Sequence, residues 1–117
     1  MKIDVDGFLP LAPATLHILL ALASEDLHGY GIMQEVARQS EGRYKLGPGT
    51  LYDNLQRLVK HGLVEEVGSR AEAESSRRRC YRLSSTGQRV LSAEIARLEG
   101  VVREARLHLK APQPRRV

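Results

Sequence analysis

The sequence predicts a mainly α-helical fold that also contains a small β-hairpin and a long C-terminal helix. Three observations support this prediction. Apolar residues recur at helical spacing in four segments, two short runs with strand character flank a polar stretch, and proline or glycine separates most of these units. At 117 residues the chain has the size of one compact domain with a protruding element.

The first three helices are predicted from their starts, stops and apolar spacing. Residues 13–24 begin with a proline suited to a first helical turn and are apolar on nearly every side, which predicts a buried helix. Residues 28–43 carry apolar side chains at three- and four-residue intervals and reach a stop around Gly42. A third helix is predicted over 48–61, again with a proline at its start and a glycine after its end.

The hairpin and the last helix follow. Residues 63–67 and 78–83 are typical of strands, and the polar residues between them predict a loop. Ser85 and Gln88 have the spacing of a capping box, and the helical pattern continues to about residue 109, before Pro112.

Composition excludes several protein classes. No apolar run is long enough to span a bilayer, the first residues lack the order of a signal peptide, and the single cysteine fits a reducing compartment, so we expect a cytoplasmic protein. The four histidines lie on separate elements and no catalytic or phosphate-loop motif is present, which argues against an enzyme, a metal site or a cofactor. The net charge of +4 allows a polyanionic partner without requiring one.

The third predicted helix divides into two faces. An arc of about 120° holds its apolar residues, namely Leu51, Tyr52, Leu55, Leu58, Val59 and Gly62. The opposite side is polar and holds Thr50, Asp53, Asn54, Gln56, Arg57, Lys60 and His61. Taken alone, this pattern indicates only a half-buried helix with a solvated face.

The order of the elements adds a specific interpretation. Three helices followed by a two-stranded hairpin with a basic loop is the order of a winged helix-turn-helix, in which the third helix enters the major groove of DNA. Arg77, Arg78 and Arg79 give the predicted wing the densest positive charge of the chain, partly offset by Glu72 and Glu74. The alternative role of these arginines is solubility alone.

Several motifs together resemble the PadR-like transcriptional regulators over residues 9–109. They are His28-Gly29-Tyr30, Pro48-Gly49-Thr50-Leu51-Tyr52, Gly62-Leu63, Tyr81-x-Leu83 and Thr86-Gly87. The resemblance implies a winged-helix homodimer that represses transcription at a promoter and is released by a small molecule. We therefore expect a DNA-binding domain over 9–84, a C-terminal dimerisation helix over 85–110, and flexible termini at 1–8 and 111–117.

The predicted DNA contacts concentrate on the third helix and the wing. Thr50 lies where the free N–H groups of a helix start favour a phosphate, Asn54 has the groups to read adenine, and Arg57 to reach guanine or a phosphate. Asp53 fits two roles, accepting from cytosine or orienting Arg57. The complete predicted set is Lys45, Gly49, Thr50, Asn54, Arg57, Lys60, Arg77, Arg78 and Arg79.

The last helix carries an apolar seam with heptad spacing. Its members are Leu91, Ile95, Leu98, Val102, Ala105 and Leu109. The helix is too long to pack only on a three-helix core, so we expect part of the seam to meet a second chain, with the first helix, Phe8 and Leu9 sharing the interface. Such a dimer favours a roughly palindromic operator.

Some positions fit two interpretations. Core positions with solvent-exposed hydroxyl groups fit Tyr30, Tyr52 and Tyr81 better than base stacking does. Cys80 fits a small buried side chain better than a redox sensor. The last helix has no aromatic residue for stacking a flat effector, so the effector is unidentified or absent. The alternative function is an adaptor that docks proteins rather than DNA.

Overall fold

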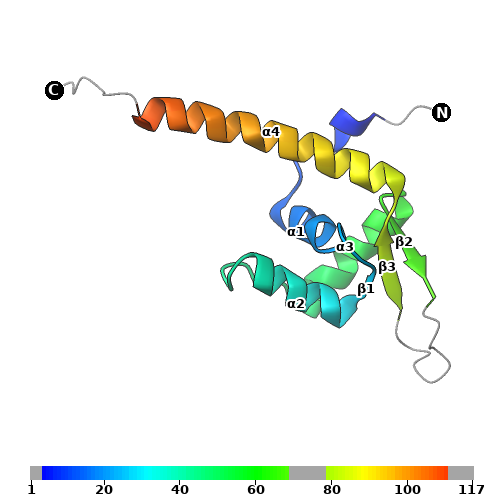
Figure 1. Ribbon diagram of the computed structural model, residues 1–117. Coiled ribbons are helices and arrows are strands. Elements are labelled where there is room, and N and C mark those ends of the chain that lie inside the picture. The colour runs from blue at the N-terminus through cyan, green and yellow to red at the C-terminus, as the bar shows by residue number, and fades with distance from the viewer. Residues whose placement is uncertain (1–3, 69–78, 111–117) are drawn as a thin grey trace.

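Residues 4–68 and 79–110 are described by the computed structural model, and the predicted mainly helical fold is confirmed. Three helices and a small sheet form the body of the domain, while the last helix runs along one side and extends beyond it (Figure 1). The elements in chain order are η1 (Val5–Phe8), α1 (Pro13–Ala21), β1 (Leu27–His28), α2 (Gly29–Gln39), α3 (Pro48–Lys60), β2 (Val64–Val67), β3 (Cys80–Leu83) and α4 (Ser85–Lys110).

The helix ends follow local chemistry. The Gly31 N–H donates to Nδ1 of His28 at 3.1 Å, so this side chain caps the start of α2. Both α1 and α2 end earlier than the sequence predicts. The chain leaves α2 through Gly42, whose φ of 77° suits glycine and whose N–H returns to the Ala37 carbonyl at 2.8 Å. Gly62, with φ of 79°, follows α3 in the same way.

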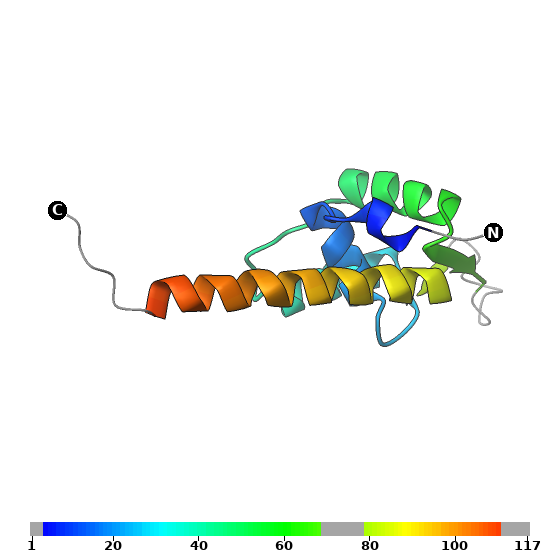
Figure 2. The ribbon, with the colours of Figure 1, turned by 90° about the horizontal axis from the view of Figure 1, so that it is seen from above.

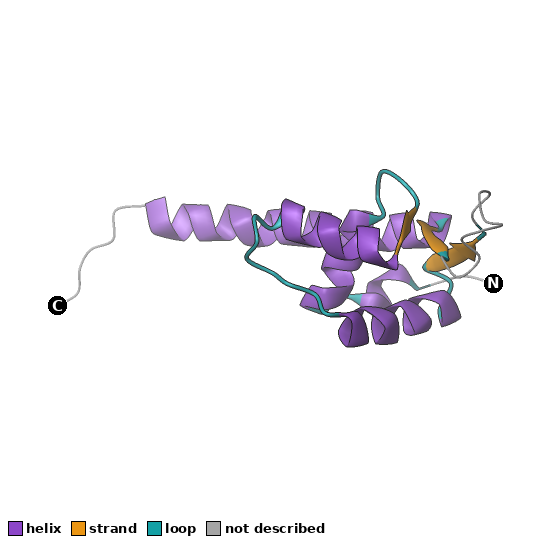
Figure 3. Cartoon of the chain, turned by 90° about the horizontal axis from the view of Figure 1, so that it is seen from below, coloured by secondary structure: helices purple, strands orange, loops and turns teal. Residues whose placement is uncertain are grey.

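The three strands form one antiparallel sheet in the order β1-β3-β2. β2 and β3 are the predicted hairpin, paired from Val64 opposite Leu83 to Val67 opposite Cys80. The hairpin loop, residues 69–78, lies outside the described residues. β1 was not predicted, because two residues are too short to show strand alternation. The sheet lies at one end of the domain, beside the start of α4 (Figure 3).

One hydrophobic core joins the helices and the sheet. Tyr81 lies in this core as predicted, but Tyr30 and Tyr52 expose 62% and 46% of their surface, so the prediction that they are core residues is wrong. Each fully buried aliphatic side chain contributes about 1.5–3 kcal/mol to folding. The most enclosed apolar residues are Ile18, Leu19, Ile32, Val36, Leu51, Leu55, Leu63, Val64 and Val90.

A compact joint around Ser84 connects α3, the hairpin and α4. The Ser84 hydroxyl donates to the Gly62 carbonyl at 2.6 Å and accepts from the Gly87 N–H at 2.9 Å. The Ser84 N–H donates to the Leu63 carbonyl at 3.0 Å. A β-carbon at Gly87 would overlap that same carbonyl oxygen. The first turn of α4 is therefore held directly against the segment that follows α3.

The N-terminal segment is also attached to α4. Glu94 is only 1% exposed; its carboxylate accepts hydrogen bonds from the Arg97 guanidinium at 2.7 and 2.9 Å and from the Leu11 N–H at 3.2 Å. The bonds from Arg97 lower the pKa of this carboxyl, and the Leu11 bond adds to the effect against the opposing effect of burial. Seen from above, η1 lies between α3 and α4 (Figure 2). Residues 5–8, predicted as part of a flexible terminus, therefore form a helix packed on α4.

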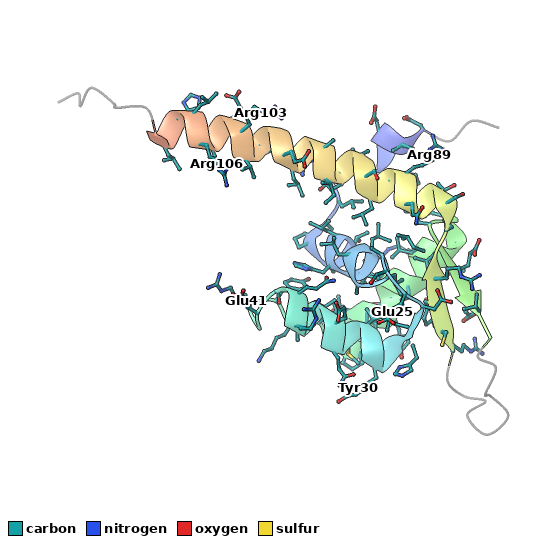
Figure 4. All side chains as sticks on the ribbon, in the orientation of Figure 1. Glu25, Tyr30, Glu41, Arg89, Arg103 and Arg106 are labelled. Carbon is teal, nitrogen blue, oxygen red and sulfur yellow. The ribbon has the colours of Figure 1, made fainter. Side chains whose placement is uncertain are left out.

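The apolar seam of α4 divides into two parts. Leu91 is buried and Ile95 packs against the same core, so this first part of the seam contacts the chain's own domain. Leu98 is partly buried. Farther along, α4 has left the domain, as Figure 4 shows around Arg103 and Arg106. The large apolar residues exposed there are Val101, Val102, Leu107 and Leu109.

Candidate nucleic-acid interface

The register of α3 decides which side chains it presents outward. Its buried residues are Leu51, Asn54, Leu55 and Leu58. At about 100° per residue, the centre of this buried face lies about 50° from the centre of the apolar arc predicted from the sequence. Tyr52 and Val59 consequently lie on a half-exposed flank. The side directly opposite the core holds Gly49, Asp53, Gln56 and Lys60, all of them exposed.

Asn54 is a structural residue in this register. It is 8% exposed, its Oδ1 accepts from the Thr15 hydroxyl of α1 at 3.0 Å, and its Nδ2 donates to the Thr50 carbonyl at 2.9 Å. The prediction that Asn54 lies on the exposed polar face is wrong. Because both ends of its amide are already bonded inside the domain, we remove Asn54 from the candidate DNA contacts.

The start of α3 remains a candidate phosphate site. Gly47 caps the helix without a side-chain hydrogen bond, and Pro48 has no N–H to donate. The N–H groups of Gly49 and Thr50 lie in the first turn, where no intrahelical acceptor exists. Gly49 is exposed, and a β-carbon there would have no atom within 4 Å, so a ligand has room to approach the backbone. The Thr50 side chain is exposed beside it.

The three predicted cations of this region are exposed, but they do not share one face. Lys60 lies on the outward side of α3, and Lys45 lies in the loop that precedes the helix. Arg57 lies on the flank toward the N-terminal segment and lines a groove of about 200 Å³. The groove also includes Phe8, Leu11, Thr15, Leu58 and His61. Arg57 is therefore placed for a contact at the edge of the interface.

The described part of the wing carries charges of both signs. Arg79 pairs with Glu66 across the hairpin at 2.9 Å, and Arg82 pairs with Asp26 at 3.1 Å. The hydrogen bonds that Arg82 donates to the Asp26 carboxylate raise the pKa of Arg82. Both pairs are exposed to solvent, which screens them, so each contributes little to stability. Arg77 and Arg78 lie outside the described residues.

A groove of about 550 Å³ separates α3 from the wing. The hydroxyl of Tyr52 reaches the start of α2, where a β-carbon on Gly29 would overlap it, so this tyrosine joins the first turns of α2 and α3. Tyr30, the neighbouring residue on α2, projects from the domain (Figure 4). The residues that line the groove are Tyr52, Asp53, Leu55, Gln56, Val59, Glu66, Arg79 and Tyr81.

Two negative findings concern the residues that the structure describes. Within 4–68 and 79–110, no group of three or more acidic, histidine or cysteine side chains is arranged to hold a metal ion. In the same part of the chain, no helix is both long and apolar enough to cross a membrane. The outward face of α3 and the two grooves beside it are thus the features that suggest a binding role.

Comparison with known proteins identifies the family. The model of the "Transcriptional regulator PadR-like family" matches residues 18–93. The chain belongs to the PadR-like family of transcriptional regulators. The resemblance inferred from the motifs is confirmed, and with it the expectation that the protein is a regulator rather than an enzyme.

Relatives and solved structures agree with this PadR-like assignment. The chain is 36% identical over 93 residues to "Transcriptional regulator Rv3488" of Mycobacterium tuberculosis, which covers 80% of this chain and 82% of that protein. A transcriptional regulator from Clostridium thermocellum has a TM-score of 0.67 at 22% identity and covers 93% of this chain and 97% of its own. A PadR family transcription regulator from Clostridium difficile has a TM-score of 0.67 at 24% identity, covering 84% and 99%. These two structures support the fold.

Sequence reasoning missed two features of this PadR-like domain. Glu94 looked like one charge among many on a helix, and only its burial against Arg97 and Leu11 distinguishes it. Gln56 was grouped with the other polar residues of α3, although it lies near the centre of the outward face. Gln56 follows Gly49 by seven residues, or about two helical turns, and this spacing places the two residues on the same side of the helix.

Proposed function

We propose that this PadR-like protein is a sequence-specific DNA-binding repressor that acts in the cytoplasm as a homodimer on a roughly palindromic operator. The observation that supports it best is the exposed face of α3, which has an uncapped first turn at one end and Lys60 at the other. A helix with polar side chains outward and free N–H groups at its start has the features that wing-containing regulators use in the major groove.

The charges of the site support a contact with phosphates rather than with a protein surface. Lys45, Thr50, Arg57 and Lys60 are exposed around α3. Arg79, with the sequence neighbours Arg77 and Arg78, adds positive charge at the wing, and its pairing with Glu66 is weak enough to yield to a phosphate. Asp53 and Glu66 line the groove between α3 and the wing, where their negative charges repel phosphates and so weaken non-specific binding to DNA.

The second half of α4 supports the homodimer. Val102 and Leu109, which belong to the apolar seam, expose 46% and 84% of their surface. Exposing apolar residues of this size to water is unfavourable, and a second copy that covers them lowers the free energy. A two-fold dimer would present two α3 faces to the same duplex.

Selection of random duplexes on the purified protein, followed by sequencing, tests DNA recognition. We expect a roughly palindromic motif whose binding weakens steeply with salt. Arg57→Ala should weaken binding to that motif by about 1–3 kcal/mol, whereas Arg89→Ala, an exposed arginine of α4, should have little effect. No enriched motif, together with salt-insensitive binding to a protein partner, would favour the adaptor function instead.

Light scattering tests the dimer separately. Val102→Glu places a charge on the exposed seam and should produce a monomer with an unchanged helical circular dichroism spectrum. Glu104→Lys lies about 200° around the helix from Val102 and is the matched control, which should remain dimeric. If Val102→Glu is still a dimer, the interface lies elsewhere.

The expectations that the protein represses transcription and is released by a small molecule rest on its membership of the PadR-like family. A promoter that carries the selected motif ahead of a reporter should be less active when the protein is present. Because the described part of α4 has no Phe, Tyr or Trp side chain, a flat aromatic effector has no stacking partner there. We expect screening for release to favour apolar compounds of another shape, and a reporter that the protein activates would exclude the repressor role.

A further inference from the structure

The outward line of α3 contains four residues, and their chemistry differs sharply. Gly49, Asp53, Gln56 and Lys60 lie within about 30° of the direction opposite the buried face. Gly49 has no side chain, and Lys60 is the last residue of the helix, whereas base edges are usually contacted from the N-terminal part of a recognition helix. Asp53 and Gln56 therefore remain as the central pair.

Gln56 is better suited than Asp53 to reading a base. A carboxylate only accepts hydrogen bonds and is repelled by the phosphates around it, and its usual partner among the bases is the cytosine amino group. The carboxamide of Gln56 is neutral and carries both a donor and an acceptor, which match N7 and the amino group of adenine in a bidentate pair.

The environment of Gln56 leaves its carboxamide available. Among the residues that the structure describes, the Gln56 side chain makes no hydrogen bond, and it borders the groove between α3 and the wing. Gln39 provides a contrast, since its amide donates to the Leu20 carbonyl and to Glu35. Asn54, the other carboxamide on α3, is fully used inside the domain.

We propose that Gln56 is the specificity-determining residue of α3 and reads an adenine in each half-site of the operator. This inference rests on the proposed DNA-binding function. Tyr52 and Val59, half-exposed on the flank toward the wing, border the same groove and exclude water from one side of the contact. Lys60 at the far end of the line would hold the register through a phosphate.

The experiment compares the motifs that four proteins select from random duplexes. They are the full-length wild type, Gln56→Ala, Gln56→Glu and Gln34→Ala, the last being a matched control because Gln34 is an exposed glutamine on α2. Wild type should select one adenine per half-site that Gln56→Ala no longer prefers, with a loss of about 5- to 150-fold in discrimination at that position only. Gln56→Glu should prefer cytosine there, because a carboxylate accepts from the cytosine amino group. Gln34→Ala should select the wild-type motif.

Two different results would overturn the inference, and they are distinguishable. If wild type selects a clear motif and both Gln56 variants select the same one, Gln56 does not read a base although the DNA-binding function stands. If wild type selects no motif, the proposed function fails and the inference fails with it. Gln56 is exposed, so both variants should unfold at the wild-type temperature, which confirms that a changed motif is not a folding defect.

Discussion

Replacing Asn54 by alanine should reduce stability much more than it reduces DNA recognition. The substitution removes the hydrogen bond from the Thr15 hydroxyl and the one to the Thr50 carbonyl. A net intramolecular hydrogen bond contributes about 0.5–1.5 kcal/mol, and two of them give an expected loss of about 1–3 kcal/mol in the free energy of unfolding. The Thr50 carbonyl remains within the helix, which places the loss toward the lower end of this range.

A double-mutant cycle with Thr15→Val isolates the contact between α1 and α3. Valine keeps the shape of threonine but leaves Oδ1 of Asn54 without its donor. We expect a coupling energy of about 1 kcal/mol between the two sites from urea unfolding of the four proteins. The measurements need one fixed protein concentration, because the stability of the proposed dimer would depend on it.

Gln56→Ala is the internal control, since an exposed side chain should change the free energy of unfolding by no more than about 0.5 kcal/mol. The reasoning would be refuted if Asn54→Ala unfolded like wild type and yet lost preference for one base of the selected motif. That result would mean that the Asn54 amide faces DNA rather than Thr15.

Two further predictions concern α4. Gly87→Ala should destabilise the domain strongly in urea unfolding, because the new β-carbon would overlap the Leu63 carbonyl oxygen, whereas Gly49→Ala, with no atom nearby, should fold normally. The stabilising contribution of Glu94 should depend on pH: its folded pKa is depressed, so this contribution is fully present above the ordinary carboxyl pKa of about 4.3 and disappears as the pH falls through the folded value. Glu94→Gln should therefore be less stable than wild type at neutral pH and approach it in acid; a difference that is the same at both pH values would exclude the ionised carboxylate as the cause.

The sequence predicted the helices, the hairpin and the family because each depends on local or repeated signals. The backbone favours proline at helix starts, as at Pro13 and Pro48, and favours glycine at the positive φ angles that follow α2 and α3. β1 escaped prediction because it forms only by pairing with β3, from which it is far separated in sequence.

The candidate site was harder to predict because the buried face of α3 cannot be read from polarity alone. Asn54 is polar and buried, since Thr15 and Thr50 satisfy its amide. Tyr52 and Val59 are apolar and half-exposed, since they border the groove beside the wing. The buried Asn54 and the half-exposed Tyr52 and Val59 both shift the true buried face of α3 in the same direction away from the predicted apolar arc. The sequence therefore predicted the correct helix but placed Asn54 wrongly on its outer face.

In the proposed homodimer, the joint at Ser84 would transmit a change in α4 to α3. The hydrogen bonds of Ser84 with Gly62 and Gly87, and the close approach of Gly87 to Leu63, hold the segment after α3 tightly against the first turn of α4. If one α4 tilted against the α4 of a second copy, the attached α3 would move with it as a rigid body. If the proposed homodimer forms through α4, the crossing angle of the two α4 helices would set the spacing of the two outward α3 faces along the duplex, and a ligand that changed this angle would move these faces away from their half-sites.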